Sequence, residues 1–298
     1  MPTSFVIGLH SYNLSPNEKN ILSELDPLGI ILFKRNIESV EQTQSLIQDA
    51  RIVTNNPNLL ILIDEEGGKV SRSNHIFNDQ IISAETIGKL YLSDPVAALE
   101  LVTETTEQII RRLKILDVNA CCAPVCDLFF GGANDVIGSR AYSGDPKIVS
   151  ILANRCCEVL AENDILPIIK HIPGHGRSDC DSHLELPIIT TSKAELVKTD
   201  FAVFKALNQM PIAMTAHIVY EALDPEHPVT TSKKAIDYIR HEIGFTNMLI
   251  SDDLCMKALK GTTAEKAKAT LDAGCDIVLH CNGDIKELEE LLQFQKSL

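Results

Sequence analysis

The sequence predicts an α/β protein with one domain, a (β/α)8 barrel of the TIM type that covers residues 1–298. Short apolar runs alternate with longer amphipathic segments along the whole chain, and eight such runs are present. Apolar strands separated by helices are typical of a parallel sheet that is buried on both faces. No glycine fingerprint for dinucleotides follows the first run, where the sequence is Gly8-Leu9-His10-Ser11. This absence favours a closed barrel over an open doubly wound sheet.

The predicted strands are short and rich in Ile, Val and Leu. In chain order they are Phe5–Leu9, Gly29–Phe33, Leu59–Asp64, Val118–Ala123, Ile165–Lys170, Ile212–Thr215, Met248–Asp252 and Ile277–His280. The segments between them have room for helices, which the crossovers between parallel strands require.

The first predicted helix has the clearest start signal. It opens with Ser15-Pro16-Asn17-Glu18, in which Ser15 caps the helix, Pro16 suits the first helical position and Glu18 completes a capping box. The other predicted helices cover 39–54, 97–115, 146–163, 193–208, 232–242, 263–273 and 284–296. The segment 65–96 carries few helix signals, so we expect a long loop there, over one face of the barrel.

The composition excludes several classes of partner. The formal charge of −14 at pH 7 argues against a surface for nucleic acid or anionic membranes, because phosphate groups need positively charged partners. The nine cysteines are odd in number and include no Cys-x-x-Cys pair, which favours reduced thiols over disulfides or a zinc ribbon. Residues 1–5 do not resemble the start of a signal peptide, and no apolar stretch approaches the length of a membrane span. We therefore expect a soluble cytoplasmic monomer without a cofactor.

Polar residues gather where the predicted strands end. They are Asp64, Lys170, His171, His217, Asp252, His280 and Asn282. The catalytic residues of (β/α)8 barrels lie at the C-terminal ends of the strands, on the loops that lead to the helices. The sequence therefore predicts a reaction site at this end of the barrel.

The densest group of titratable residues follows the fifth predicted strand, within 170–183. Asp181 lies two residues before His183, so its carboxylate can orient the imidazole and raise its basicity, as a general acid/base requires. His171, His175, Asp181 and His183 are also residue types that bind zinc. Their spacing, however, matches neither His-Glu-x-x-His nor a zinc finger. His175, between two glycines, is also compatible with a structural role.

Two acidic residues, Asp252 and Asp253, directly follow the seventh apolar run. A carboxylate at a barrel mouth can act as a nucleophile, a general base or a metal ligand. Asp is also common at helix N-caps. Two adjacent acids allow both roles, with Asp252 for the chemistry and Asp253 for capping.

Two further segments suggest ligand binding. Asp64 precedes the glycine pair Gly67-Gly68, and an Asp carboxylate can accept two hydrogen bonds from neighbouring sugar hydroxyls. Arg140, in a loop, offers five donors and a fixed charge. Each signal is weak alone, because a glycine pair is more often a turn and a loop arginine is usually solvated.

Taken together, these segments resemble the family 3 glycoside hydrolases, and within them the bacterial β-N-acetylglucosaminidases of the NagZ type. The matching stretches are Gly29–Ile37, Ile63–Arg72, Ile137–Tyr142, Lys170–Gly176 with Asp181–His183, Met214–His217 and Ser251–Leu254. Each stretch is weak evidence alone, but the set occurs in the family's order. The departures are Ile172, where the family usually has Phe, and Glu65, where it often has Gln; both are expected to be peripheral to the chemistry.

The resemblance implies an enzyme that removes terminal β-linked N-acetylglucosamine with retention of configuration. It implies that Asp252 is the nucleophile and that His183, with Asp181 as its partner, is the acid/base. The residues that would hold the hydroxyl and N-acetyl groups of the sugar are Asp64, Arg72, Arg140, Lys170 and His171. An imidazole would thus replace the second carboxylate of the usual glycosidase, and we expect the reacting groups roughly 5–5.5 Å apart. The loop that carries His183 is expected to close over the substrate.

By resemblance, the substrate is a cytoplasmic peptidoglycan fragment, N-acetylglucosamine linked to anhydro-N-acetylmuramic acid with or without a peptide, as in cell-wall recycling. Three alternatives stay open. A phosphorylase would use the same Asp252 and His183 with phosphate as the acceptor. A metal-dependent hydrolase would bind its metal through His171, His175 and His183. A catalytically silent sugar-binding protein is disfavoured, because Asp252, Asp181 and His183 are all present.

Overall fold

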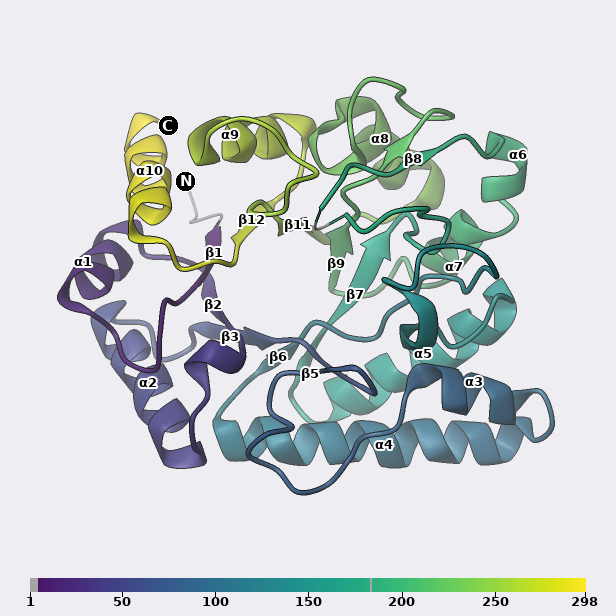
Figure 1. Cartoon of the computed structure of the whole chain (residues 1–298), viewed down its shortest axis with the longest axis horizontal. Coiled ribbons are helices and arrows are strands. Elements are labelled where there is room, and N and C mark those ends of the chain that lie inside the picture. The colour runs from purple at the N-terminus through teal and green to yellow at the C-terminus, as the bar shows by residue number, and fades with distance from the viewer. Residues whose placement is uncertain (1–4, 183) are drawn as a thin grey trace.

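The computed structural model describes residues 5–182 and 184–298, and its centre is a closed barrel of eight parallel strands (Figure 1). Around the barrel the strands follow the order β1, β12, β11, β9, β7, β6, β3 and β2. Their bounds are β1 (Phe5–Gly8), β2 (Gly29–Leu32), β3 (Leu60–Ile63), β6 (Ala120–Cys121), β7 (Leu166–Ile172), β9 (Ile212–Thr215), β11 (Met248–Asp253) and β12 (Ile277–His280). All eight predicted strands and the TIM-type barrel are confirmed.

Two strands continue past their predicted ends, and both become irregular there. In β7 the pairing with β9 shifts register between Lys170 and Ile172. In β11 the pairing with β12 shifts between Ile250 and Asp253. Such bulges occur next to active sites because they re-aim side chains. They place His171 and Asp252 in irregular backbone at the C-terminal mouth of the barrel.

Helices surround the barrel, as Figure 1 shows. Their bounds are α1 (Pro16–Leu25), α2 (Val40–Val53), α3 (Ala84–Tyr91), α4 (Pro95–Leu116), α5 (Pro146–Glu162), α6 (Lys193–Leu196), α7 (Asp200–Ala206), α8 (Lys233–Tyr238), α9 (Thr263–Ala273) and α10 (Ile285–Ser297). The predicted capping box at α1 is confirmed: Ser15 Oγ accepts the N–H of Glu18, and the Glu18 carboxylate accepts the N–H of Ser15. In the described part of the chain no helix is long and apolar enough to span a membrane.

Short elements lie in the loops at the ends of the barrel. They are the strands β4 (Glu65–Gly67), β5 (Val70–Ser71), β8 (Ile188–Ile189) and β10 (Val219–Tyr220) and the 3-10 helices Lys34–Asn36, Gly138–Arg140 and Val229–Thr231. A π-helix at Ile239–Ile243 directly continues α8. Strands β4 and β5 form an antiparallel hairpin directly after β3. Strands β8 and β10 pair outside the barrel.

The prediction of a loop over 65–96 is wrong, because this segment holds the β4–β5 hairpin, α3 and the start of α4. Helix α3 has only eight residues, too few to show a clear period, but Ser83 caps it by accepting the N–H of Thr86. The predicted helix 193–208 is also interrupted. It is divided into α6 and α7 around Thr199, whose backbone is not helical.

The barrel strands are buried on both faces. One set of side chains fills the barrel interior, and it includes Val6, Ile31, Leu62, Cys122, Ile168, Met214, Ile250 and Leu279. Their sequence neighbours, such as Phe5 and Ile7 of β1, point to the helices, since alternate residues of a strand face opposite sides. Cysteines lie in both layers. All nine are among the described residues, and all nine are free thiols.

Candidate active site

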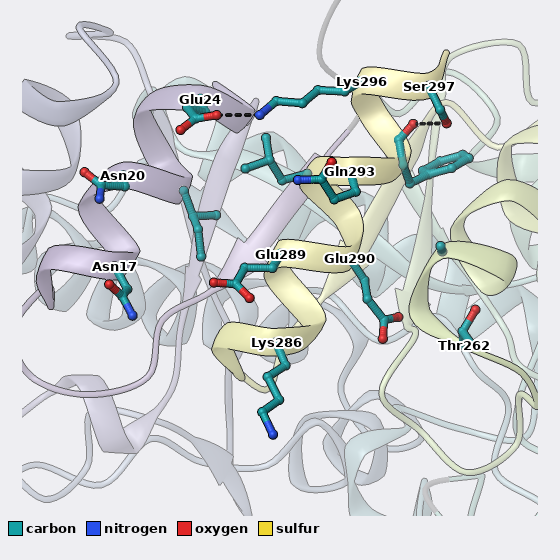
Figure 2. Close-up of a pocket in the computed structure, with 14 residues that line it drawn as sticks. Asn17, Asn20, Glu24, Thr262, Lys286, Glu289, Glu290, Gln293, Lys296 and Ser297 are labelled. Atoms are coloured by element: carbon teal, nitrogen blue, oxygen red, sulfur yellow. Dashed lines mark hydrogen bonds and ion pairs between the residues drawn. The ribbon is translucent and has the colours of Figure 1, made fainter.

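Two cavities of the molecule differ in size and in lining. The larger, of about 820 Å³, is a groove beside α1, α9 and α10, where an ion pair joins Glu24 to Lys296 (Figure 2). It contains none of the predicted site residues. The smaller, of about 290 Å³, lies at the C-terminal mouth of the barrel and is lined by Asp64, Arg72, Arg140, Lys170, His171, Asp181 and Asp252. These are all the predicted site residues except His183, which lies outside the described residues.

Asp64 occupies one wall of the smaller cavity, directly after β3. Lys170 Nζ, from β7, donates to Asp64 Oδ1 at 2.7 Å. Arg72 Nη2, after the β4–β5 hairpin, donates to Asp64 Oδ2 at 2.9 Å. Burial raises the pKa of Asp64, but Lys170 and Arg72 outweigh burial and hold it well below its ordinary value. The carboxylate is therefore ionised, and both of its oxygens are engaged.

Glu66 lies beside this pair and is equally engaged. Arg140 grips its carboxylate with two parallel bonds, Nε to Oε2 at 2.7 Å and Nη2 to Oε1 at 2.8 Å. Lys170 Nζ lies 2.6 Å from Glu66 Oε1. Burial raises the pKa of Glu66, yet Arg140 and Lys170 lower it further than burial raises it. Lys170 thus joins two carboxylates, and for this reason its own pKa is raised despite the opposing effect of its burial.

Another buried carboxylate, that of Glu65, holds the β4–β5 hairpin, which Arg72 directly follows. The fully buried Glu65 carboxylate accepts a hydrogen bond from Arg112 Nη1 of α4 at 2.9 Å. It also accepts the backbone N–H groups of Arg72 and Ser73, at 3.1 and 3.2 Å. Glu65 does not line the cavity, as expected for a peripheral residue, but it fixes the backbone from which Arg72 reaches Asp64.

Histidines form the opposite wall. His171, at the bulge of β7, pairs through Nδ1 with Asp127 Oδ2 at 2.7 Å. The other Asp127 oxygen accepts the backbone N–H groups of His171 and His175, at 3.1 and 2.7 Å. Asp127 is fully buried, and although burial raises its pKa, the adjacent His171 lowers it below the ordinary value. Asp127 therefore orients the ring of His171 and anchors the start of the loop that follows β7.

His175 and His217 are both held neutral. Burial, with the nearby His171, lowers the pKa of His175 to about 4, and His175 Nε2 lies 2.8 Å from Ser182 Oγ. Burial also lowers the pKa of His217, whose Nε2 donates to the Asp253 carbonyl at 3.0 Å. His175 thus binds the loop to itself, which agrees with its suggested structural role.

Asp252 lies at the end of β11, among these histidines. Burial raises the pKa of Asp252, but the neighbouring His217 and His171 outweigh burial and lower it. One of its oxygens, Oδ1, accepts the N–H of Asp253 at 2.8 Å. A buried carboxylate that is ionised at neutral pH and faces a cavity has the properties of a nucleophile.

The prediction that Asp253 caps a helix is wrong. Helix α9 begins ten residues later and is capped by Thr262. Asp253 Oδ1 instead accepts the N–H groups of Cys255 and Cys281, at 2.9 and 3.0 Å. It therefore joins the loop after β11 to the end of β12 and supports the position of Asp252.

Comparison with known proteins identifies the family. Residues 6–298 match the glycosyl hydrolase family 3 N terminal domain. The chain belongs to this family. A β-hexosaminidase of Bordetella avium (strain 197N) is 34% identical over 285 residues, which are 94% of this chain and 81% of that protein.

Solved structures of family 3 proteins share the fold. NagZ from Neisseria gonorrhoeae in complex with N-trifluoroacetyl-D-glucosamine has a TM-score of 0.88 and 31% identity, over 98% of this chain and 84% of that one. A family 3 β-N-acetylglucosaminidase from Paenibacillus sp. str. FPU-7 has a TM-score of 0.89 and 27% identity, and the chain spans 56% of its length. The predicted enzyme class, a glycosidase of the β-N-acetylhexosaminidase class, is confirmed.

Two residues of this family 3 site were missed by sequence analysis. The sequence predicts no separate role for Glu66, which lies within the matching stretch Ile63–Arg72, and none for Asp127. Glu66 had a signal, because it lies two residues after Asp64 at the end of a strand. Asp127 is a lone acid that closes the apolar stretch after the fourth predicted strand. A search for carboxylates after each strand finds both.

A metal site at the histidine cluster is the alternative that the residue types allow. The contacts of two members are now known: His171 Nδ1 pairs with Asp127, and His175 Nε2 with Ser182. Among residues 5–182 and 184–298, neither ring belongs to a group of side chains with metal-ligand spacing. His183 lies outside these ranges. The metal-dependent hydrolase therefore stays a hypothesis, which activity measured with and without a chelator tests.

Proposed function

We propose that this chain is a retaining exo-β-N-acetylglucosaminidase with Asp252 as its nucleophile. The observation that carries the proposal is the ionised, buried Asp252 at the mouth of the barrel, facing a cavity whose opposite wall is a cluster of engaged charges. The cavity of about 290 Å³ is near the lower end of the range of small-ligand sites, roughly 300–1,000 Å³, which favours one terminal sugar over a long saccharide.

In the first step of the proposed mechanism, the Asp252 carboxylate attacks the anomeric carbon of the sugar. The bond from that carbon to the leaving oxygen breaks, and the imidazolium of His183 gives its proton to this oxygen. In the second step the neutral His183 takes a proton from water, which displaces Asp252 and restores the configuration. Asp181, which lines the cavity, is proposed to orient His183 and to stabilise its charged form.

The charged wall, together with His171 of the histidine wall, is proposed to bind the sugar. Asp64, Arg72, Lys170 and His171 supply the donors and acceptors for its hydroxyl and N-acetyl groups. In the structure Arg140 uses Nε and Nη2 on Glu66 and Nη1 on the Val136 carbonyl, at 3.0 Å. We therefore assign Arg140 mainly to positioning Glu66 and Lys170, and only secondarily to the sugar. Because these groups are already paired, the wall needs little reorganisation when substrate binds.

For the physiological substrate we propose peptidoglycan fragments, N-acetylglucosamine linked to anhydro-N-acetylmuramic acid with or without a peptide. The structurally similar Neisseria gonorrhoeae NagZ was solved with N-trifluoroacetyl-D-glucosamine, which supports a site for an N-acylated glucosamine. A single-domain, monomeric, cytoplasmic enzyme of cell-wall recycling remains part of the proposal. Such an enzyme needs no cofactor.

A phosphorylase is the second candidate. On the charged wall, Arg72, Arg140 and Lys170 outnumber the carboxylates Asp64 and Glu66 that they contact. The net positive charge of this wall favours an anionic acceptor close to the sugar. In that reaction phosphate, and not water, attacks the glycosyl-enzyme, and the product is the sugar phosphate.

The first experiment is hydrolysis of a chromogenic β-N-acetylglucosaminide, in phosphate and in phosphate-free buffer, each with and without a chelator. We expect release of free N-acetylglucosamine in all four conditions. Activity that requires phosphate and yields the sugar phosphate identifies the phosphorylase. Loss of activity in the presence of the chelator supports the metal-dependent hydrolase. Binding of the sugar without turnover in any condition supports the catalytically silent sugar-binding protein.

A further inference from the structure

A second group of side chains with ligand chemistry lies outside the proposed active site. It consists of Cys255, His280 and Glu287, each of which offers one ligand atom within 4.8 Å of the other two. None of the three lines the cavity that holds Asp252. They come from three different segments: the loop after β11, the last residue of β12 and the first turn of α10.

The backbone around this group is held in place. Asp253 Oδ1 accepts the N–H groups of both Cys255 and Cys281, and the N–H of Leu254 donates to the Leu279 carbonyl at 3.0 Å. The loop of Cys255 is therefore joined to the strand of His280 by one backbone bond and by the Asp253 carboxylate, which accepts from both segments. A ligand set needs such support, because a metal site requires its donors at fixed positions.

His280 is the buried member of this group. Its side chain is 1% exposed, and Nε2 lies 2.8 Å from Glu287 Oε2. Nδ1 is buried and has no hydrogen-bond partner among the described residues. Nδ1 and Nε2 point to different sides of the imidazole ring, so the nitrogen that a cation would bind is Nε2, which faces Glu287.

We propose that Cys255, His280 and Glu287 bind a divalent cation of the zinc class. Sulfur, nitrogen and oxygen donors suit zinc, and three protein ligands leave a fourth position for water. A thiolate and a carboxylate balance the charge of the cation. A site that includes a thiolate disfavours calcium and magnesium, which take oxygen ligands.

The geometry requires only a small adjustment. With bonds of roughly 2.0–2.1 Å to nitrogen and oxygen, a tetrahedral site separates these two donors by about 3.3 Å. The His280–Glu287 contact at 2.8 Å must therefore widen slightly. The Glu287 side chain is 39% exposed and can make this movement, whereas His280 is fixed by burial. A bound cation would fasten the loop after Asp252 to β12 and α10.

Cobalt is the probe, since a thiolate bound to Co²⁺ gives a charge-transfer absorption band that imidazole and carboxylate do not give. The full chain is stripped of metal and titrated with Co²⁺ alone. The matched control is Cys180→Ser, because Cys180 is the other partly exposed cysteine. We expect one equivalent to saturate the band in the wild type and in Cys180→Ser, and no band in Cys255→Ser. We expect Glu287→Gln to weaken binding at least about tenfold, and the exposed Glu289→Gln to leave it unchanged.

Thermal unfolding with Zn²⁺ gives a second readout that does not depend on activity. A cation that binds only the folded chain raises the Tm, by an amount that grows with its concentration above Kd. We expect this rise in the wild type and not in Cys255→Ser, whose Tm without metal shows that it folds. A cobalt band that is absent from the wild type or persists in Cys255→Ser overturns the proposal. An equal rise of Tm in both proteins also overturns it, because the cation then binds elsewhere.

Discussion

The two walls of the active-site cavity differ in the ionisation of their side chains. On the wall formed by β3, the β4–β5 hairpin and β7, Asp64 and Glu66 are paired with Lys170, Arg72 and Arg140, and all five remain charged. On the wall formed by the end of β7 and the loops after it and after β9, His175 and His217 are neutral because burial lowers the pKa of each.

This difference separates recognition from chemistry. The charged wall offers donors and acceptors whose protonation does not change between about pH 5 and pH 9. The pKa values of its carboxyl groups lie below this range, and those of its lysine and arginines lie above it. On the histidine wall, His217 and His171 lie close enough to Asp252 to lower the pKa of its carboxyl, so the carboxylate stays ionised and available as a nucleophile.

The largest effect is expected from Asp252→Ala. Without the proposed nucleophile no glycosyl-enzyme forms, and kcat/KM for a chromogenic β-N-acetylglucosaminide falls on the order of 10³–10⁵-fold. Steady-state kinetics and the pre-steady-state burst measure this loss. Asp253→Asn is the neighbouring control: it removes charge from a residue that joins backbone segments, and we expect mainly a lower Tm. A normal burst in Asp252→Ala excludes it as the nucleophile.

His183→Ala is expected to have the next largest effect, of about 10²–10⁴-fold on substrates with poor leaving groups. A leaving group that is already acidic needs no proton, so activated aryl glycosides should lose much less in the first step. The measurement compares kcat/KM across leaving groups of different pKa. Equal losses on activated and unactivated substrates contradict the role of His183 as the acid.

The barrel and much of the site were predictable, for a physical reason. In a parallel barrel the C-terminal ends of all strands converge, so polar residues after apolar runs, such as Asp64, Lys170 and Asp252, must lie near one another. Which charge pairs with which was not predictable. Arg140 and Glu66 are 74 positions apart and meet only after folding. The roles assigned to these residues in catalysis and in sugar binding stay predictions.

The local elements that were missed are those with too few residues to show a period. Strands β4 and β5 have three and two residues, and their pairing depends on Gly67 and Gly68, both with positive φ. Asp127 was missed because β6 has only two residues and the strand pattern ends well before this acid. Short strands bounded by irregular backbone are stabilised by tertiary contacts, which a single sequence does not display.

Glu66→Gln tests the charged wall. The variant keeps the shape of the side chain but leaves Arg140 and Lys170 beside a neutral amide, and breaking a buried ion pair costs roughly 3–5 kcal/mol. We expect a lower free energy of unfolding in urea and a raised KM for the sugar. Glu100→Gln, at an exposed position, is the control and should change neither quantity. An unchanged free energy of unfolding in Glu66→Gln contradicts the assignment of this wall as a preorganised charge cluster.

The smallest effect is the pH dependence that the histidine wall imposes on stability. The pKa of His175 falls from 6.5 to about 4 on folding. Between these values the unfolded chain binds a proton that the folded chain does not, so stability is present above pH 6.5 and is lost as the pH falls toward 4. From about pH 7 to about pH 5, His175 alone should remove about 2 kcal/mol of unfolding free energy. In this window the carboxylates of the charged wall, whose pKa values are lowered, add only a small slope of the same sign.

Urea unfolding at several pH values measures this slope. His175→Gln should flatten it by about 2 kcal/mol over the same window, whereas His10→Gln, at an exposed position, should leave it unchanged. The residual slope in His175→Gln reports His217, whose pKa is also lowered by burial and which therefore contributes with the same sign. An equal slope in the wild type and in His175→Gln contradicts the lowered pKa of His175, and the contrast between the two walls is then wrong.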